Sequence, residues 1–227
     1  MKAGLNRFVW NLRREDPTRV QGLMTLGQIR GNRVPPGKYQ VKLTAGGRTM
    51  TQSIDVLADP RVEVTDADRA AYIAMSNAAY QRVSELHEAV VRMRDVREQV
   101  NGLMGRTREL PNTKEIAAAG KGIADSVAAL DGRLVSPKAR TFQDVVNFRN
   151  GLNDQYLFMM EALDETDPPV TQGFRDRFRD LDAEWAGHQR RIERLFDVDV
   201  ANFNKLVQAG GATPVIIQKP KPRPVAM

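Results

Sequence analysis

Two histidines are the side chains best suited to bind a metal or transfer a proton in this chain, which contains no cysteine. The lack of cysteine excludes disulfides, thiolate zinc sites and cysteine nucleophiles. His188 lies on an apolar stripe with helical spacing and is expected to be a core residue, whereas His87 falls just off such a stripe and is expected to face solvent. A metal site would need both at one level with carboxylates between them, from Glu85, Glu88 and Glu184. No HExxH or ExxH pairing occurs, so we predict no metal ligands.

Acidic side chains are frequent towards the C-terminus, but they alternate with arginines, a pattern typical of a solvated helix face. A glycosidase needs two carboxylates that converge across a cleft with separated pKa values, and spacing along one helix cannot establish that. The sequence therefore assigns no catalytic residue. The carboxylates are Asp164, Glu165, Asp167, Asp176, Asp180, Asp182 and Glu184, and the arginines among them include Arg175, Arg177 and Arg179.

A phosphate-binding loop is the remaining chemical motif to consider, because Gly120 and Lys121 are adjacent. Glu115 stands where the loop requires its first glycine, and Gly122 stands where Ser or Thr must follow the lysine. The motif therefore fails, and we predict no cofactor and no cofactor-binding residue.

The elements that would position these side chains are mainly helical. A long helix is predicted over 65–104, with Thr65 and Asp68 as a capping box and Arg82 as the one break in its apolar seam. Two shorter helices follow, one capped by Asn112 and one that carries Phe148, Leu152, Tyr156, Met159 and Leu163. A second long helix is predicted from about Thr171 to Gln208. With short links, these four would form an up-down-up-down bundle that brings the end of the fourth helix beside the start of the first.

Residues 1–62 are predicted to be β structure. Residues 4–13 (GLNRFVWNLR) alternate like a half-buried strand, and residues 35–56 read as a hairpin that turns at Gly46-Gly47. The turn places Ala45 opposite Arg48, Leu43 opposite Met50, Val41 opposite Gln52 and Tyr39 opposite Ile54. Three strands are too few for a complete immunoglobulin-like domain.

The fold class is therefore α+β and mainly α. The predicted parts are a partial immunoglobulin-like segment (1–62), an antiparallel four-helix bundle with two long and two short helices (63–209), and a flexible tail rich in Pro and Lys (210–227).

The net charge of +6 is unevenly distributed. Residues 1–62 carry 11 Lys or Arg against 4 Asp or Glu, whereas residues 63–218 carry 20 against 24. The basic excess lacks the aromatic platform or basic helix that nucleic-acid binding uses, so we predict no nucleic-acid partner. No apolar run approaches the length of about 18 residues that a membrane span needs, so we also predict no span.

Several segments together resemble the C-terminal region of bacterial proteins with sortilin-type, BNR-repeat propellers, which are described as glycosyl-hydrolase-like. The segments are GLNRFVWNLR, PPGKYQVKLT, DPRVEVTDAD, VVRMRDVREQV, LVSPKARTFQDVVNFRNGLNDQ and DVANFNKLV, in the family's order over nearly all of residues 3–208. The resemblance implies an immunoglobulin-like piece, a helical bundle and a periplasmic or extracellular location. The propeller's S-x-D-x-G-x-T-W box is absent, so no catalytic residue can be transferred to this chain.

Two functions follow as expectations. The first is a noncatalytic interaction module that docks to a propeller or self-associates through an open β edge beside Phe8 and Trp10. The segment Pro214–Ile217 could also cover that edge. The alternative is a part of a carbohydrate-processing glycosyl hydrolase whose active site lies in other sequence, so enzyme activity of this chain alone is not expected.

Overall fold

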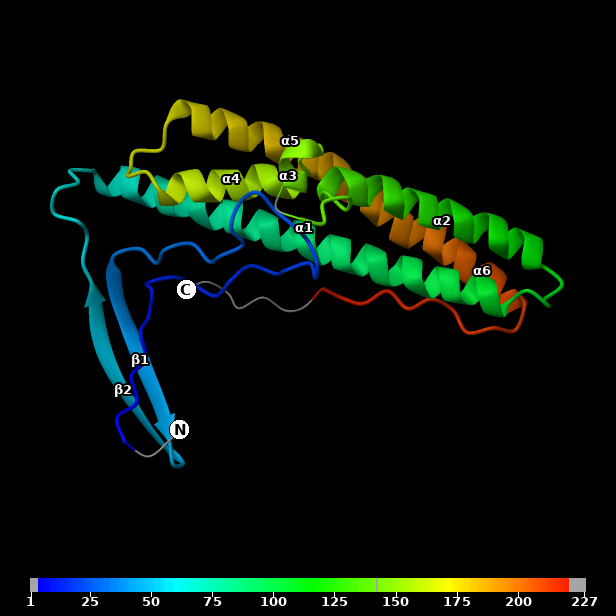
Figure 1. Ribbon diagram of the computed structural model, residues 1–227, viewed down its shortest axis with the longest axis horizontal. Helices are drawn as coiled ribbons and strands as arrows, with labels where there is room; N and C mark the ends of the chain where they lie inside the picture. Colours follow the sequence, from blue (N-terminus) through cyan, green and yellow to red (C-terminus); the bar gives the residue numbers. More distant parts are fainter. Residues whose placement is uncertain (1–3, 142, 221–227) are drawn as a thin grey trace.

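The structure, a computed structural model, describes residues 4–141 and 143–220 and is mainly helical with one small sheet (Figure 1). The long α1 begins where the predicted cap places it, because Thr65 Oγ1 accepts from the Asp68 backbone N–H at 3.1 Å. In chain order the elements are β1 (Gly37–Ala45), β2 (Arg48–Val56), α1 (Asp66–Arg106), α2 (Thr113–Leu134), α3 (Asp144–Asn147), α4 (Leu152–Asp164), α5 (Gln172–Arg194), the π-helical turn η1 (Leu195–Val200) and α6 (Ala201–Ala209).

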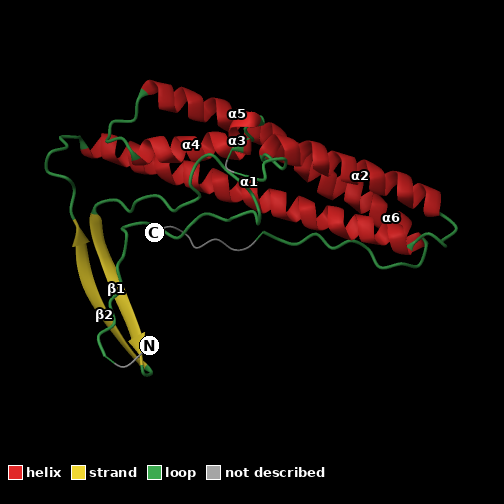
Figure 2. Cartoon of the chain, in the orientation of Figure 1, coloured by secondary structure: helices red, strands yellow, loops and turns green. Residues whose placement is uncertain are grey.

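The helices form three rods, which differs from the predicted up-down-up-down bundle of four (Figure 2). α1 is the first rod, and α5, η1 and α6 follow one another without a break to form the second. The second rod runs parallel to α1. α2 and α4 lie end to end along α1 and form the third rod, antiparallel to the other two. At 1.5 Å per residue this tandem spans about 50 Å against about 60 Å for α1. The two short helices together therefore cover most of the long one.

Contacts at both ends establish these directions. The Tyr72 hydroxyl donates to the Leu163 carbonyl, which places the end of α4 beside the start of α1. At the other end, the Asn112 amide donates to the Leu206 carbonyl at 2.8 Å. The end of the second rod therefore lies beside the end of α1, and its predicted place beside the start of α1 is wrong. Asn112 also makes no side-chain cap of α2, contrary to the prediction.

The connection between α2 and α4 explains why the two helices share a direction. A Cβ on Gly151 would lie 2.5 Å from the Val135 Cα, so the chain leaves the rod after α2 and returns to nearly the same point. The described residues of this excursion are 136–141 and 143–150, which include α3. The third helix was predicted to include Phe148, but Phe148 lies within the excursion, and α4 begins only at Leu152.

The core lies along the seam between the rods, and its polar and charged side chains are few. Gly120 allows close packing here, because a Cβ there would lie 2.6 Å from Met104 Sδ and 3.2 Å from Phe203 Cε2. The largest fully buried side chains are Tyr156, Phe203, Leu86, Met93, Ile116, Leu134, Leu157, Leu163, Leu181, Leu195, His87 and Val83.

The hairpin has the predicted register, with Leu43 opposite Met50 and Tyr39 opposite Ile54. Gly46 and Gly47 adopt φ of 56° and 74°, the left-handed values that this two-residue turn requires. β1 and β2 lie beside the N-terminal end of α1 and point away from the rods (Figure 1). The helices therefore do not cover the apolar face of the hairpin.

Residues 4–13 do not form the predicted third strand. In the described chain, the β pairing of this segment is limited to an isolated antiparallel bridge between Arg13 and Arg33. Leu12 has φ of 58°, which turns the backbone out of an extended path, while Trp10 packs edge-on against Tyr39 with ring centroids 5.6 Å apart. The alternation of side chains was correctly observed, but a strand also needs a neighbouring ladder, and this segment lacks one.

The segment after α6 runs back along the bundle. The Val215 N–H donates to Asn204 Oδ1 at 2.7 Å, and the Ile216 N–H donates to Gln99 Oε1 at 2.9 Å. Val215 is buried. Residues Pro214–Ile217 therefore pack against α1 and α6, and the proposal that they cover the β edge is wrong. Residues 221–227 of the predicted flexible tail lie outside the described residues.

Trp185 tests the packing of the rods. Its side chain is 3% exposed, so Trp185→Ala should lower the free energy of unfolding by about 3–5 kcal/mol through the cavity that it leaves. Phe158 on α4 is 66% exposed and provides the matched control, since Phe158→Ala should change stability by less than about 0.5 kcal/mol. Urea denaturation followed by circular dichroism measures both, and equal losses would contradict this packing.

Candidate functional site

The two histidines lie in separate environments. His188 is buried, as predicted; its Nε2 lies 3.7 Å from Glu184 Oε1, and burial lowers the pKa of its imidazole. His87 is fully buried, and its predicted exposure to solvent is wrong. Among residues 4–141 and 143–220, no three potential ligands from His, Asp and Glu come together as a metal site.

His87 is buried because a segment from the β region crosses α1. We call residues 16–32 the strap. His87 Nδ1 lies 2.6 Å from the Thr18 carbonyl oxygen, whereas its Nε2 is buried with no hydrogen-bond partner. Burial lowers the pKa of the imidazole. Sequence reasoning missed this contact because the apolar residues of the strap have no regular spacing.

The strap also contacts the third rod. Leu23 and Ile29 pack against the core, and a Cβ on Gly27 would lie 3.0 Å from Leu157 Cβ. At its C-terminal end, Asn32 Nδ2 donates to Ser76 Oγ at 3.0 Å. The only sequence feature that could have indicated this packing is the presence of apolar residues in the strap, because they follow no periodic pattern.

The most extensive polar cluster joins all three rods. Arg82 on α1 binds Asp182 on α5 with two hydrogen bonds of 2.8 and 3.1 Å, and the Tyr156 hydroxyl of α4 donates to Asp182 at 2.8 Å. Arg82 also binds Glu85 at 3.0 Å, and the Trp185 indole N–H points to the same carboxylate at 3.4 Å. The cluster explains the break at Arg82 in the apolar seam.

The electrostatics of this cluster oppose proton transfer near neutral pH. The hydrogen bond to Asp182 raises the pKa of the Arg82 guanidinium, so the guanidinium stays charged. Burial, followed by the hydrogen bond to Asp182, raises the pKa of the Tyr156 hydroxyl. Arg82 and Tyr156 therefore keep their protons, and the geometry supports a role in positioning the rods.

Two of the carboxylates expected on a solvated face instead bind arginines of other elements. Asp182 binds Arg82, and Asp164 is buried and pairs with Arg13 and with Arg30 of the strap. Asp176 behaves as predicted, since it pairs with Arg179 on the exposed side of α5. Helical periodicity identified the charged face but could not show which carboxylates meet a distant arginine.

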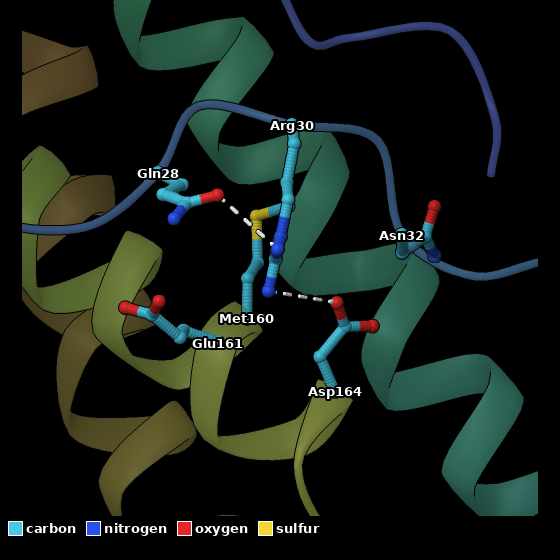
Figure 3. A pocket seen from close by; sticks show the side chains of 6 residues that line it. All are labelled: Gln28, Arg30, Asn32, Met160, Glu161 and Asp164. Atoms are coloured by element: carbon cyan, nitrogen blue, oxygen red, sulfur yellow. Dashed lines mark hydrogen bonds and ion pairs between the residues drawn. The ribbon is translucent and has the colours of Figure 1, made fainter. Parts of the chain in front are cut away.

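Figure 3 shows a pocket between the strap and the end of α4. Arg30 spans it, donating to Gln28 at 3.1 Å and pairing with Asp164 at 3.5 Å. The space inside is about 10 Å³, which is the room that about one water molecule needs. A sugar ring cannot enter, so Glu161 and Asp164 do not form a hydrolytic pair there. The lining residues are Gln28, Arg30, Asn32, Met160, Glu161 and Asp164.

The most exposed apolar surface lies on the β structure. We call residues 4–13 together with 37–56 the β arm. Phe8 is 87% exposed, and Val41, Leu43 and Met50 are 47%, 45% and 63% exposed. Trp10 covers the base of the hairpin by packing on Tyr39, so the uncovered part is the half nearer the turn. This face is a candidate docking surface.

Asp182→Asn tests the cluster of polar side chains. The substitution removes the charge that faces Arg82, and we expect the free energy of unfolding to fall by about 1.5–3 kcal/mol, the range for hydrogen bonds to charged groups. Asp176→Asn removes an exposed ion pair from the same helix and should cost less than about 1 kcal/mol. Thermal and urea unfolding give both values, and a loss in Asp182→Asn no larger than in the control would contradict the role of this cluster.

Comparison with known proteins adds no identification: no protein-family model, no curated protein and no solved structure matches the chain. Within the part of the chain that the structure describes, no helix is both long enough and apolar enough to cross a membrane.

Proposed function

We propose that this chain is a noncatalytic interaction module whose β arm docks to a β-rich partner. The resemblance in sequence favours the propeller of a sortilin-type BNR-repeat protein as that partner, in the periplasm or outside the cell. The observation that carries the proposal is the apolar face of the hairpin, on which Val41, Leu43 and Met50 are each about half exposed.

The physics of small sheets supports this proposal. A two-stranded hairpin alone is marginally stable in water, and at least three strands or a packed helix are needed to stabilise one. In the described chain β1 pairs with β2 alone, so each strand has an outer edge without a ladder. A partner that supplies strands would satisfy these backbone groups and bury the apolar face.

The segment 4–13 also supports docking to a partner that supplies strands. Its alternating apolar side chains are typical of a strand, yet Phe8 remains exposed, while Trp10 packs on Tyr39 of the hairpin. A partner strand beside this segment would complete the partial immunoglobulin-like sheet that the sequence predicts. The basic charge of residues 1–62 favours a partner with an acidic surface.

The second candidate function is a part of a carbohydrate-processing glycosyl hydrolase, which rests on the family resemblance. Its active site would lie in propeller sequence outside this chain. The pocket beside Asp164 and Glu161 has room for about one water, so these two carboxylates do not frame a sugar-binding cleft.

Substitutions at the hairpin test the docking proposal. With a purified sortilin-type propeller as the probe, the chain should bind saturably, and Leu43→Lys with Met50→Lys should weaken the binding at least about tenfold, since two apolar contacts become charged. Val146→Lys, at an exposed apolar residue of α3, is the matched control and should bind like the unchanged chain. Equal binding by all three proteins, measured by biolayer interferometry, would refute docking through the hairpin.

An activity assay tests the alternative. The chain alone should not hydrolyse aryl glycosides or polysaccharides, because the pocket beside Glu161 and Asp164 is too small for a sugar ring. Addition of the propeller in trans distinguishes the two functions: turnover that appears only in the mixture would support the hydrolase, and turnover by the chain alone that one carboxylate substitution removes would overturn the noncatalytic assignment.

A further inference from the structure

Near the middle of α1, the strap is held mainly through Thr18. Its N–H lies 3.4 Å from Ser84 Oγ, its carbonyl 2.6 Å from His87 Nδ1, and its hydroxyl 3.2 Å from Glu88 Oε1. Val20 follows and is buried. His87 therefore contributes directly to the docking of the strap, beside the contact of Asn32 with Ser76.

The hydrogen bond to the Thr18 carbonyl determines the tautomer of His87. A carbonyl oxygen only accepts, so Nδ1 must carry the proton and the neutral ring has a bare Nε2. Nε2 is buried without a hydrogen-bond partner. For an unprotonated nitrogen, this burial costs only a modest amount of free energy. Protonation would place an N–H and a positive charge at a position without an acceptor, and a buried unpaired charge is strongly disfavoured.

We propose that the strap is a pH-sensitive latch: protonation of His87 in mildly acidic conditions releases residues 16–32 from α1 and frees the β arm. The strap joins the two parts of the arm, since residues 4–13 precede it and β1 follows it. The proposal concerns the strap itself and holds whatever the β arm binds.

Charged groups on α1, on the strap and on α4 have hydrogen-bond or ion-pair partners other than His87. On α1, Glu88 is turned to the Thr18 hydroxyl; on the strap, Arg19 pairs with Asp16. On α4, Asp154 accepts from the Gly151 N–H at 3.0 Å. His188 on α5 is paired with Glu184 of the same helix.

The direction of the pH effect follows from the pKa shifts. Burial lowers the pKa of His87 from 6.5, so the docked state has its full stability above about pH 6.5 and loses it as the pH falls through the docked pKa. Burial raises the pKa of Asp154 from 3.8, although backbone hydrogen bonds, including one from Leu26 of the strap, lower it. The test is therefore confined to about pH 5.0–7.5, the range that contains the ordinary pKa of histidine.

Linkage also sets an upper limit on the effect. If the released histidine titrates at its ordinary pKa and the docked one does not titrate, a change from about pH 7.5 to 5.0 shifts the docking equilibrium by at most about 30-fold. A docked pKa between these limits gives a smaller factor.

Hydrogen exchange of the full chain at the two pH values, corrected for the intrinsic exchange rates, measures release. Strap amides should lose protection several-fold and at most about 30-fold at the lower pH, while α2 and α6 keep theirs. His87→Asn retains an N–H that can reach the Thr18 carbonyl but does not titrate, so its strap should respond little to pH. His188→Asn changes the only other histidine and should respond like the unchanged chain.

NMR titration of the histidine rings in the unchanged chain decides the matter if His87→Asn does not dock its strap. The latch requires the Nδ1-protonated tautomer at neutral pH and a titration of His87 that coincides with loss of strap protection. Strap protection that is equal at both pH values would overturn the proposal, as would a pH response in docked His87→Asn equal to that of the unchanged chain.

Discussion

The ion pair between Arg82 and Asp182 determines the register in which the rods meet. Tyr72, Ala79, Leu86, Met93 and Val100 recur at every seventh residue of α1, so an apolar seam alone would pack almost equally well after a slide of seven residues. Arg82 interrupts this repeat, and its two hydrogen bonds to Asp182 exist in one register only. Because the Tyr156 hydroxyl binds the same carboxylate, the third rod is held in the same register. One partly buried polar cluster thus supplies a specificity that the apolar repeat lacks.

The sequence predicted structure best where local chemistry determines the backbone. Gly46-Gly47 determines a hairpin turn and, through it, the pairing of every residue in β1 and β2. Thr65 and Thr171 mark helix starts for a similar reason, since each hydroxyl accepts from the backbone two or three residues into the helix. The direction of α4 was mispredicted because a 15-residue excursion that returns to its origin cannot be distinguished by local signals from a simple reversal.

Side-chain environments were predictable only where the helix itself decides them. His188 lies on the apolar stripe of α5, and its burial follows from periodicity. The burial of His87 comes from the strap, whose apolar residues Val20, Leu23 and Ile29 have no regular spacing and cover α1 from some 60 residues away in sequence. Asp164 is a similar case, because its arginine partners belong to the N-terminal segment. Long-range contacts between an irregular segment and a helix produce no periodic pattern in the sequence of the irregular segment, so sequence analysis cannot detect them.

The distribution of contacts divides the chain into a part that is stabilised internally and a part that is not. The rods bury large side chains such as Tyr156 and Phe203 completely, whereas the hairpin keeps Met50 about two-thirds exposed and has no helix packed on it. The strap connects the two parts, since it packs on α1 and α4 and continues directly into β1. The strap also covers part of the core, because Val20 is buried in it and Gly27 lies against Leu157. No residue of the Arg82 cluster belongs to the strap, so the contacts that set the register of the rods are separate from those that hold the strap. Local opening of the strap would therefore affect the β arm and the Leu157 side of the core before it affects that register.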